Sequence, residues 1–193
     1  MTTATTSAPN IVRYSLAPEQ STFTVQAYAE GLFSAFGHDP VIAIRDFSGE
    51  AEFVPDTFEV ANVKLTVKAD SLAVANDVKE KDRVEIERMM RDEVLETAKY
   101  PEIAFVSSNV SASRMGKDRY RARIIGDLTL HGVTQKNLWI SAEVTLSGDN
   151  LQAKGEFTLK QTDFGIKLVS VAGGTLKVKN ELKFSFNLAA TKS

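Results

Sequence analysis

Apolar and polar residues alternate along most of this chain, in stretches separated by turn-forming residues. The clearest stretch has an apolar residue at every second position: Leu138, Ile140, Ala142, Val144 and Leu146. Near the end of the chain the same pattern returns with Leu182, Phe184, Phe186 and Leu188. Because successive side chains of a β-strand point to opposite faces, each stretch predicts a strand with one apolar and one polar face.

The pattern predicts eight strands in all. They lie near residues 11–29 with a break at Pro18, 40–54, 58–69, 102–114, 119–131, 135–147, 150–161 and 174–190. Turn-forming sequences separate three pairs of them: Met115–Asp118, His131–Thr134 and Ser147–Asn150. Such alternation is typical of antiparallel sheets with one face in water. Since closure removes exposed sheet edges, we expect an all-β fold, an eight-stranded antiparallel β-barrel.

One segment, residues 77–98, has helical rather than strand periodicity. Asp77, with Glu80 three residues later, is typical of a capping box at the start of a helix. Glu87 and Arg91 lie four residues apart, which predicts an ion pair on the outer side of the helix. The apolar stripe consists of Ile86, Met89, Met90 and Val94. We therefore expect an amphipathic helix that covers one end or the outside of the barrel.

The sequence predicts a single domain. Residues 1–10 are expected to form a disordered lead-in and residues 11–191 a single barrel domain, with a short helical turn around Gly31–Phe36. The first residues lack the features of a signal peptide, which predicts a cytoplasmic protein, or a periplasmic one if a leader has been removed. No apolar run approaches the ~20 residues of a membrane-spanning helix, so we expect no membrane span.

Charge and reactive residue types disfavour several classes of function. The formal net charge is −2, whereas nucleic acids and anionic membranes attract chains with concentrated basic residues. The chain has no cysteine, which excludes disulfides, thiolate metal ligands and a cysteine nucleophile. Its two histidines, His38 and His131, cannot form a three-histidine metal site. We expect no metal, no cofactor and no nucleic acid, and catalysis is disfavoured.

A few residues allow two interpretations. His38 and Asp39 form either an acid–base pair at the mouth of a cavity or a hydrogen-bonded turn. His131 follows the last residue of an apolar strand. It is either a hydrogen-bonded structural residue or a residue that binds a ligand. Trp139 lies on the otherwise polar face of its strand, where it either packs beneath a helix or loop or contacts another protein. Met89 and Met90 are either plain core or the adaptable lining of a portal.

Five stretches of the chain resemble the motifs of one family, in the family's order. They are Tyr14–Phe23, Phe47–Glu50, Lys99–Phe105, Gly126–Thr134 and Thr162–Ile166. The resemblance is to the YceI-like family of lipocalin-like, polyisoprenoid-binding proteins, and it extends over residues 11–190. In the first motif Tyr14, Ala17 and Gln20 depart from the family pattern.

The resemblance implies a lipocalin-like barrel around a long apolar channel, with the helix packed at its side. The implied ligand is an isoprenoid or fatty-acid-like lipid, such as a prenyl phosphate or a prenyl quinone. Twelve inward-facing residues are candidates for the tail lining: Phe23, Val25, Val63, Leu65, Phe105, Leu128, Leu138, Ile140, Phe157, Leu182, Phe184 and Phe186. Head-group candidates are His38, Arg45, His131 and Lys167. The resemblance also implies a possible homodimer, for which Trp139 is the interface candidate.

Our main hypothesis is therefore non-catalytic lipid binding inside the barrel, driven by burial of apolar surface. One alternative is an enzyme on the same barrel that acts on a lipid-like substrate with His38 and Asp39. Another is a structural or stress-response module, whose barrel is filled by its own side chains and whose dimer interface includes Trp139.

Overall fold

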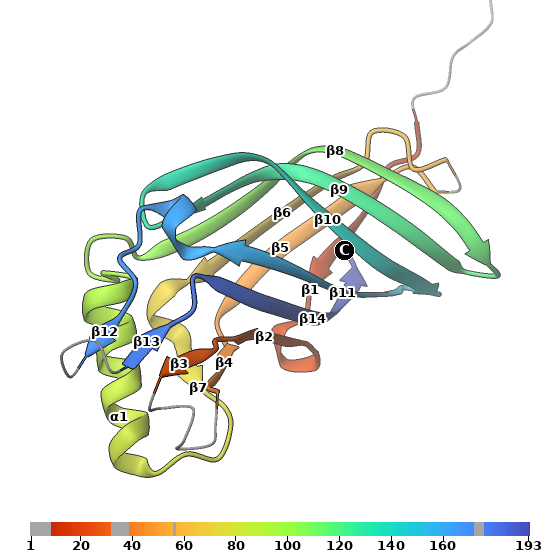
Figure 1. Ribbon diagram of the computed structural model, residues 1–193. Helices are drawn as coiled ribbons and strands as arrows, with labels where there is room; N and C mark the ends of the chain where they lie inside the picture. Colours follow the sequence, from red (N-terminus) through yellow and green to blue (C-terminus); the bar gives the residue numbers. More distant parts are fainter. Residues whose placement is uncertain (1–8, 32–38, 56, 172–175) are drawn as a thin grey trace, which may run out of the picture.

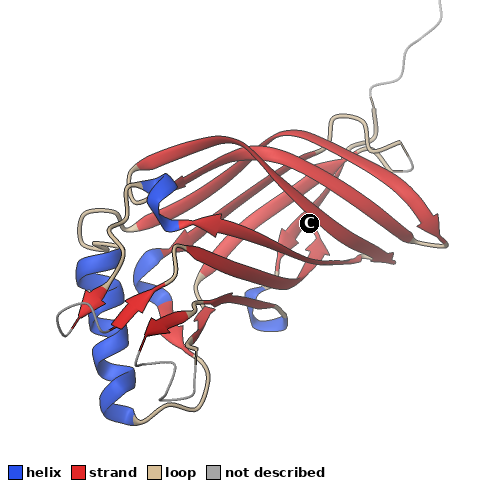
Figure 2. Ribbon diagram, viewed as in Figure 1, coloured by secondary structure: helices blue, strands red, loops and turns tan. Residues whose placement is uncertain are grey.

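The fold is an antiparallel β-barrel with a helix at one end. A computed structural model describes residues 9–31, 39–55, 57–171 and 176–193 (Figures 1 and 2). The strands of the main sheet are β1 (Val12–Leu16), β2 (Thr22–Gln26), β4 (Val41–Ile44), β5 (Phe47–Phe53), β6 (Asn62–Lys68), β7 (Leu72–Val74), β8 (Glu102–Gly116), β9 (Arg119–Leu130), β10 (Val133–Ser147), β11 (Asn150–Lys160) and β14 (Glu181–Lys192). Within the described part of the chain these eleven strands form one continuous sheet.

The sheet closes on itself through β14. Starting at β1, the hydrogen-bonded order is β1–β5–β6–β8–β9–β10–β11–β14, and β14 pairs back with β1, where Leu16 lies opposite Ala190. The three predicted hairpins connect β8 to β9, β9 to β10 and β10 to β11. The predicted eight-stranded antiparallel barrel is therefore confirmed.

Two of the predicted barrel strands are broken into shorter ones, and a third is followed by a short strand that was not predicted. A 3₁₀ turn at Pro18–Gln20 separates β1 from β2, and both strands pair with β14. This is the break expected at Pro18, which lacks the N–H that a strand ladder needs. The predicted strand 40–54 likewise bends at Asp46 into β4 and β5, and β7 continues β6 after a 3₁₀ turn at Ala69–Ser71. The predicted start of β6 at residue 58 was wrong, because Phe58 and Val60 adopt positive φ angles of 55° and 56° in a loop.

A small second sheet takes the beginning of the predicted last strand. It contains β3 (Ala29–Gly31), β12 (Ser170–Val171) and β13 (Leu176–Val178) in the order β12–β13–β3. The predicted strand 174–190 therefore divides at Lys179 and Asn180, and only β14 belongs to the barrel. The predicted turn around Gly31–Phe36 lies largely outside the described residues.

The helix lies at one end of the barrel, beside β7, which among the described strands is paired on one edge only, with β4. It consists of α1 (Glu80–Met89), continued by a wider π-helical turn over Met90–Val94. The predicted boundaries, 77–98, were too wide. The predicted capping box was also wrong: the N-cap is Lys79, without a side-chain bond, and Glu80 lies 3.5 Å from Arg83. Figure 1 shows α1 beside the small sheet, covering this end of the barrel.

Two strand glycines allow phenylalanine rings to lie flat against the barrel wall. Gly155 is directly opposite Phe186, and a Cβ added at Gly155 would come within 2.5 Å of the Phe186 ring. The same distance separates a Cβ added at Gly126 from the ring of Phe105. An aromatic ring that covers a strand glycine in this way supplies the cross-strand packing that glycine itself lacks.

We therefore predict that Gly155→Ala lowers the free energy of unfolding by about 1–3 kcal/mol, the usual cost of overpacking. The matched control is Gly116→Ala in the β8–β9 hairpin, where an added Cβ has no neighbour within 4 Å. Chemical denaturation of both variants measures the difference. Equal stability of the two variants would show that the ring of Phe186 yields without cost.

Candidate binding cavity

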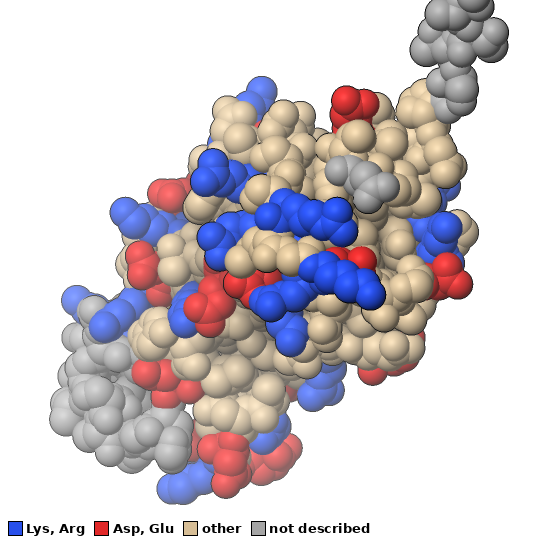
Figure 3. Space-filling view, turned by 90° about the vertical axis from the view of Figure 1, so that its right-hand side faces the viewer, with Lys and Arg blue, Asp and Glu red and all other residues tan. Residues whose placement is uncertain are grey.

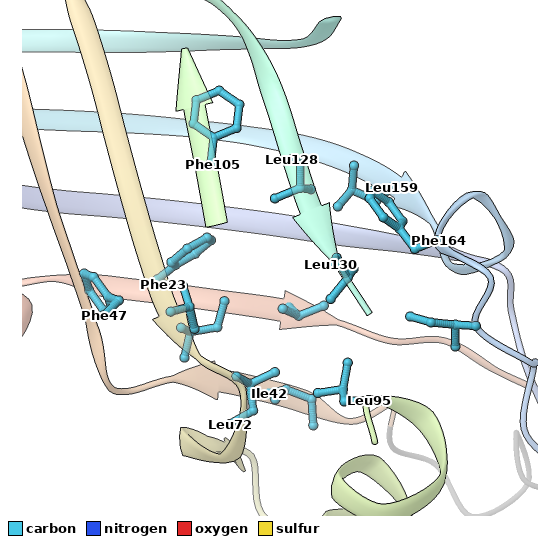
Figure 4. Packing of buried hydrophobic residues seen from close by; sticks show 14 of the residues in the cluster. Phe23, Ile42, Phe47, Leu72, Leu95, Phe105, Leu128, Leu130, Leu159 and Phe164 are labelled. Carbon is cyan, nitrogen blue, oxygen red and sulfur yellow. The ribbon is translucent and has the colours of Figure 1, made fainter. Parts of the chain in front are cut away.

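The described part of the barrel surrounds a long apolar cavity of about 1060 Å³. Its walls are the inward-facing residues of the strands, which alternate with outward-facing polar ones. Figure 4 shows this arrangement near the middle of the barrel, where Phe105 and Leu128 project from one wall and Phe23 and Phe47 from another. Ligand sites usually measure about 300–1,000 Å³, so this space is slightly larger than the upper limit of that range.

All twelve residues predicted from the sequence to line the barrel do line this cavity. Four of them form an aromatic group in the middle: Phe157 stacks on Phe184 with 4.8 Å between ring centroids, and Phe23 contacts both Phe184 and Phe186. Their contact with a bound lipid stays a prediction.

Alanines widen the deeper half of the cavity, and these lining residues were not predicted from the sequence. Ala112, Ala122 and Ala142 lie side by side on β8, β9 and β10, and all three line the cavity together with Ala153 of β11. Because alanine projects only a methyl group, the space continues past the phenylalanines. Their alternate spacing was visible in the sequence, but their neighbouring positions depend on the strand register.

A plug of aromatic rings closes the deep end. Tyr14 stacks on Phe53 at 5.6 Å, Phe53 on Phe58 at 5.1 Å, and Phe58 contacts Tyr120 edge-on at 4.7 Å. Burial raises the pKa of the Tyr14 hydroxyl, and the nearby Asp149 carboxylate raises it further. The Tyr14 hydroxyl therefore stays protonated and uncharged at neutral pH, which suits its buried position beside an apolar chamber.

The opposite end is bordered by the helix. The whole predicted stripe, Ile86, Met89, Met90 and Val94, lines the cavity. The methionine pair thus forms part of the cavity wall, and Met90 also packs against the hydrophobic core. Charged residues around the N-terminal end of the helix also border the space: Asp77, Lys79, Lys81 and Asp82. All four are exposed, so an apolar chamber meets a polar rim here.

Two helix side chains attach α1 to the free edge of β7. Glu87 Oε1 accepts a 2.9 Å hydrogen bond from the backbone N–H of Val74, and Arg83 Nη1 donates a 2.6 Å bond to the carbonyl of Val74. Val74 is fully buried, at 0% exposure. The predicted outer Glu87–Arg91 pair was therefore wrong, because Glu87 completes the hydrogen bonding of a strand edge instead.

His131 attaches the chain after the helix to the barrel rim. Its Nε2 lies 2.6 Å from Glu96 Oε2, its Nδ1 lies 3.3 Å from the carbonyl of Phe164, and its ring centroid lies 4.5 Å from that of Tyr100. His131 is not among the cavity-lining residues. This geometry favours the structural interpretation of His131 over a ligand-binding one.

The remaining candidates lie away from the cavity wall or outside the described residues. Arg45 and Lys167 are exposed, and neither lines the cavity. His38 falls outside the described residues, and Asp39 is exposed. Trp139 is 55% exposed on the outer wall, so it does not pack beneath the helix. In the described ranges no three His, Asp or Glu side chains come together as a metal site requires, and no helix there is long and apolar enough to cross a membrane.

Comparison with known proteins identifies the family. The model of the YceI-like domain matches residues 14–190. The chain belongs to the YceI-like family. A UPF0312 protein of Shewanella denitrificans is 32% identical over 156 residues, which cover 75% of each chain. UPF0312 proteins of Pseudomonas syringae are 30% identical over 131 residues, 64% of this chain, and the chain spans 62% of their length.

Solved structures of low sequence identity share the fold. BcnA of Burkholderia cenocepacia superimposes with a TM-score of 0.69 at 19% identity, over 91% of this chain and 99% of that one. A polyisoprenoid-binding domain of Saccharophagus degradans has a TM-score of 0.64 at 15% identity, over 93% and 98%. The lipocalin-like barrel expected from the sequence motifs is thus the barrel of this family.

We predict that Glu87→Ala weakens the attachment of the helix, because it leaves the buried Val74 N–H without an acceptor at a cost of about 1–3 kcal/mol. Hydrogen exchange at the Val74 amide should become faster, together with exchange in α1. Glu87→Gln, which keeps an acceptor oxygen, is the control and should exchange more slowly than the alanine variant. Unchanged exchange in Glu87→Ala would show that packing alone holds the helix.

Proposed function

We propose that this protein binds a long-chain amphiphilic lipid, of the polyisoprenoid, prenyl quinone or fatty-acid type, with its tail inside the barrel. The main observation in support is the cavity of about 1060 Å³, which the protein's own side chains leave open. A barrel filled by side chains, as the structural-module alternative requires, would not contain such a space. The polyisoprenoid-binding domain of Saccharophagus degradans, with the same fold, supports the choice of ligand class.

The physical driving force is the burial of apolar chain. Each methylene moved from water into an apolar site contributes about 0.8 kcal/mol. The cavity extends from the rim at α1, past the phenylalanine group, to the aromatic plug, so an extended tail has an apolar partner along its whole length. Such a site discriminates between ligands by chain length more than by chemical detail.

Binding without catalysis suits the distribution of polar groups. The phenylalanine group and the alanine-lined strip present hydrocarbon side chains to a bound tail, and the charged residues that border the cavity lie at the α1 rim and on β5, β6 and β11 (Glu50, Glu52, Lys64 and Lys160). The enzyme alternative depends on His38 and Asp39. Asp39 is not among the residues that line the cavity.

The ligand class can be tested by native mass spectrometry of the protein purified under mild conditions, followed by organic extraction. We expect a co-purified prenyl or fatty-acid-like chain, or uptake of one on incubation with long prenyl alcohols and fatty acids. An apo mass that stays unchanged with all of these lipids would contradict the proposal.

We further predict that Ala122→Phe shortens the usable cavity, because the ring would fill the alanine-lined half. Binding of a long prenyl alcohol should weaken at least tenfold, whereas binding of a short one of two or three isoprene units changes little. The matched control is Ala104→Phe on the outer face of β8, since Ala104 is next to the inward-facing Phe105 and does not line the cavity. Parallel losses for long and short chains would instead indicate general misfolding.

The rim is proposed to hold the lipid head group. We predict that replacing Lys79 and Lys81 by glutamine weakens binding of a fatty acid by about two- to fivefold, as expected for exposed charge pairs. Binding of the fatty alcohol of equal chain length should stay the same, because it has no charge. Titration calorimetry of both ligands gives the comparison. An equal effect on acid and alcohol would place the head group elsewhere.

A further inference from the structure

The outer wall of the barrel carries a line of arginines at the end away from the helix. Arg119, Arg121 and Arg123 occupy alternate positions of β9, so their side chains leave the same outward face. All three are exposed, and their inward neighbours Tyr120 and Ala122 are buried. Figure 3, which faces the end of the barrel where β9 begins, shows Lys and Arg side chains gathered near its middle.

Few carboxylates offset this charge. Glu143 of β10 lies 4.0 Å from both Arg119 and Arg121, so one carboxylate is shared between two guanidinium groups. Lys154 of β11 is opposite Glu143 on its other side and adds a further positive charge. On the β8 side, Arg121 and Arg123 are flanked by Ser113 and Ser111, whose short side chains leave the guanidinium groups open. A chain with net charge −2 thus has a locally basic face.

An apolar patch continues the arginine line. The next outward residue of β9 after Arg123 is Ile125, and it lies directly opposite Trp139 of β10. Trp139 is 55% exposed and is the chain's single tryptophan. Asp127, the outward residue after Ile125, accepts a hydrogen bond from the backbone N–H of Asn137. Guanidinium groups and an exposed indole therefore share one surface, which we name the Arg–Trp face (Arg119, Arg121, Arg123, Ile125, Trp139 and Lys154).

We propose that the Arg–Trp face docks the protein on the surface of an anionic phospholipid bilayer. Arginine pairs with phosphate in a planar two-bond geometry, and tryptophan favours the boundary between head groups and acyl chains. This surface interaction goes beyond lipid binding in the cavity and does not depend on it. The arginines lie towards the plugged end of the barrel, so docking leaves the rim at α1 unobstructed.

The shape of the face favours a bilayer over a peptide or a nucleic acid. β9 is hydrogen-bonded to β8 and β10 along both edges, so it offers no free edge to an added strand. Single-stranded nucleic acids bind in basic grooves with successive aromatic residues. Here the surface is the outer wall of a closed barrel, with one aromatic ring at its end. Mobile lipids can adapt to such a wall.

Trp139 reports directly on this docking. The experiment uses the full chain and vesicles of phosphatidylcholine, either alone or with one third phosphatidylglycerol. With the anionic vesicles we expect co-sedimentation, a blue shift of the tryptophan emission and quenching by brominated lipid chains. Raising the salt concentration should reverse all three effects, because it screens exposed charges.

The variant R119S/R121S/R123S should lower the partition coefficient roughly 100-fold, since each basic residue at an anionic surface contributes about fivefold. The matched control K99S/K167S/K177S changes the net charge equally, but its residues lie outside the Arg–Trp face, towards the helix end of the barrel. It should bind nearly as well as the unmodified protein. A fold defect in either variant is recognised by circular dichroism and by the melting temperature.

Several outcomes would overturn the proposal. Equal binding to neutral vesicles, or equal losses in the two triple variants, would show that the Arg–Trp face is not the docking surface. Sedimentation without any change in tryptophan emission would place the contact elsewhere. A shift of the tryptophan emission that depends on protein concentration, without vesicles, would indicate that a second copy of the chain binds the Arg–Trp face. A shift with an oligonucleotide or an acidic peptide, but not with vesicles, would assign the face to that partner.

Discussion

The pairing of β14 with the first strands of the barrel is the constraint on which the rest of the structure depends. One edge of β14 is hydrogen-bonded to β11, and the other edge pairs with both β1 and β2. Because this pairing closes the sheet, all the inward-facing residues of the barrel surround the same interior. An open sheet of the same strands would need a second layer to cover its apolar face. In the closed barrel, the opposite wall covers the apolar face instead of a second layer.

Closure alone does not keep the interior open, because an eight-stranded barrel can also be filled by its own side chains. The distribution of side-chain volumes determines whether the interior is open or filled. Phe186 and Phe105 lie against the wall over Gly155 and Gly126 rather than across the interior. Alanines widen the next section, and aromatic rings close only its far end. The result is a chamber with one closed end and a polar rim at the other.

The helix and the outer wall show how polar residues contribute to this arrangement. In the described part of the chain β7 is the last strand of the sheet, and Arg83 and Glu87 supply hydrogen-bond partners to its outer edge. This attachment uses three hydrogen bonds, two at Val74 and one from Arg83 to the carbonyl of Asn76, which is a small contact for an element that borders a cavity. On the outer wall, alternation collects the arginines of β9 on one side. A nearly neutral chain thereby acquires a basic face.

The barrel and the direction of its side chains could be predicted from the sequence, because the alternation of apolar and polar residues is a local property of a strand. The family motifs pointed to the same barrel, and the twelve predicted lining residues all line the cavity. Which polar groups lie close together could not be predicted in this way. Glu87 bonds to Val74, His131 bonds to Glu96, and Arg45 and Lys167 lie away from the cavity, because these distances depend on strand register and on the docking of the helix. The open interior also required the fold, since it depends on which residues face each other across strands distant in the sequence.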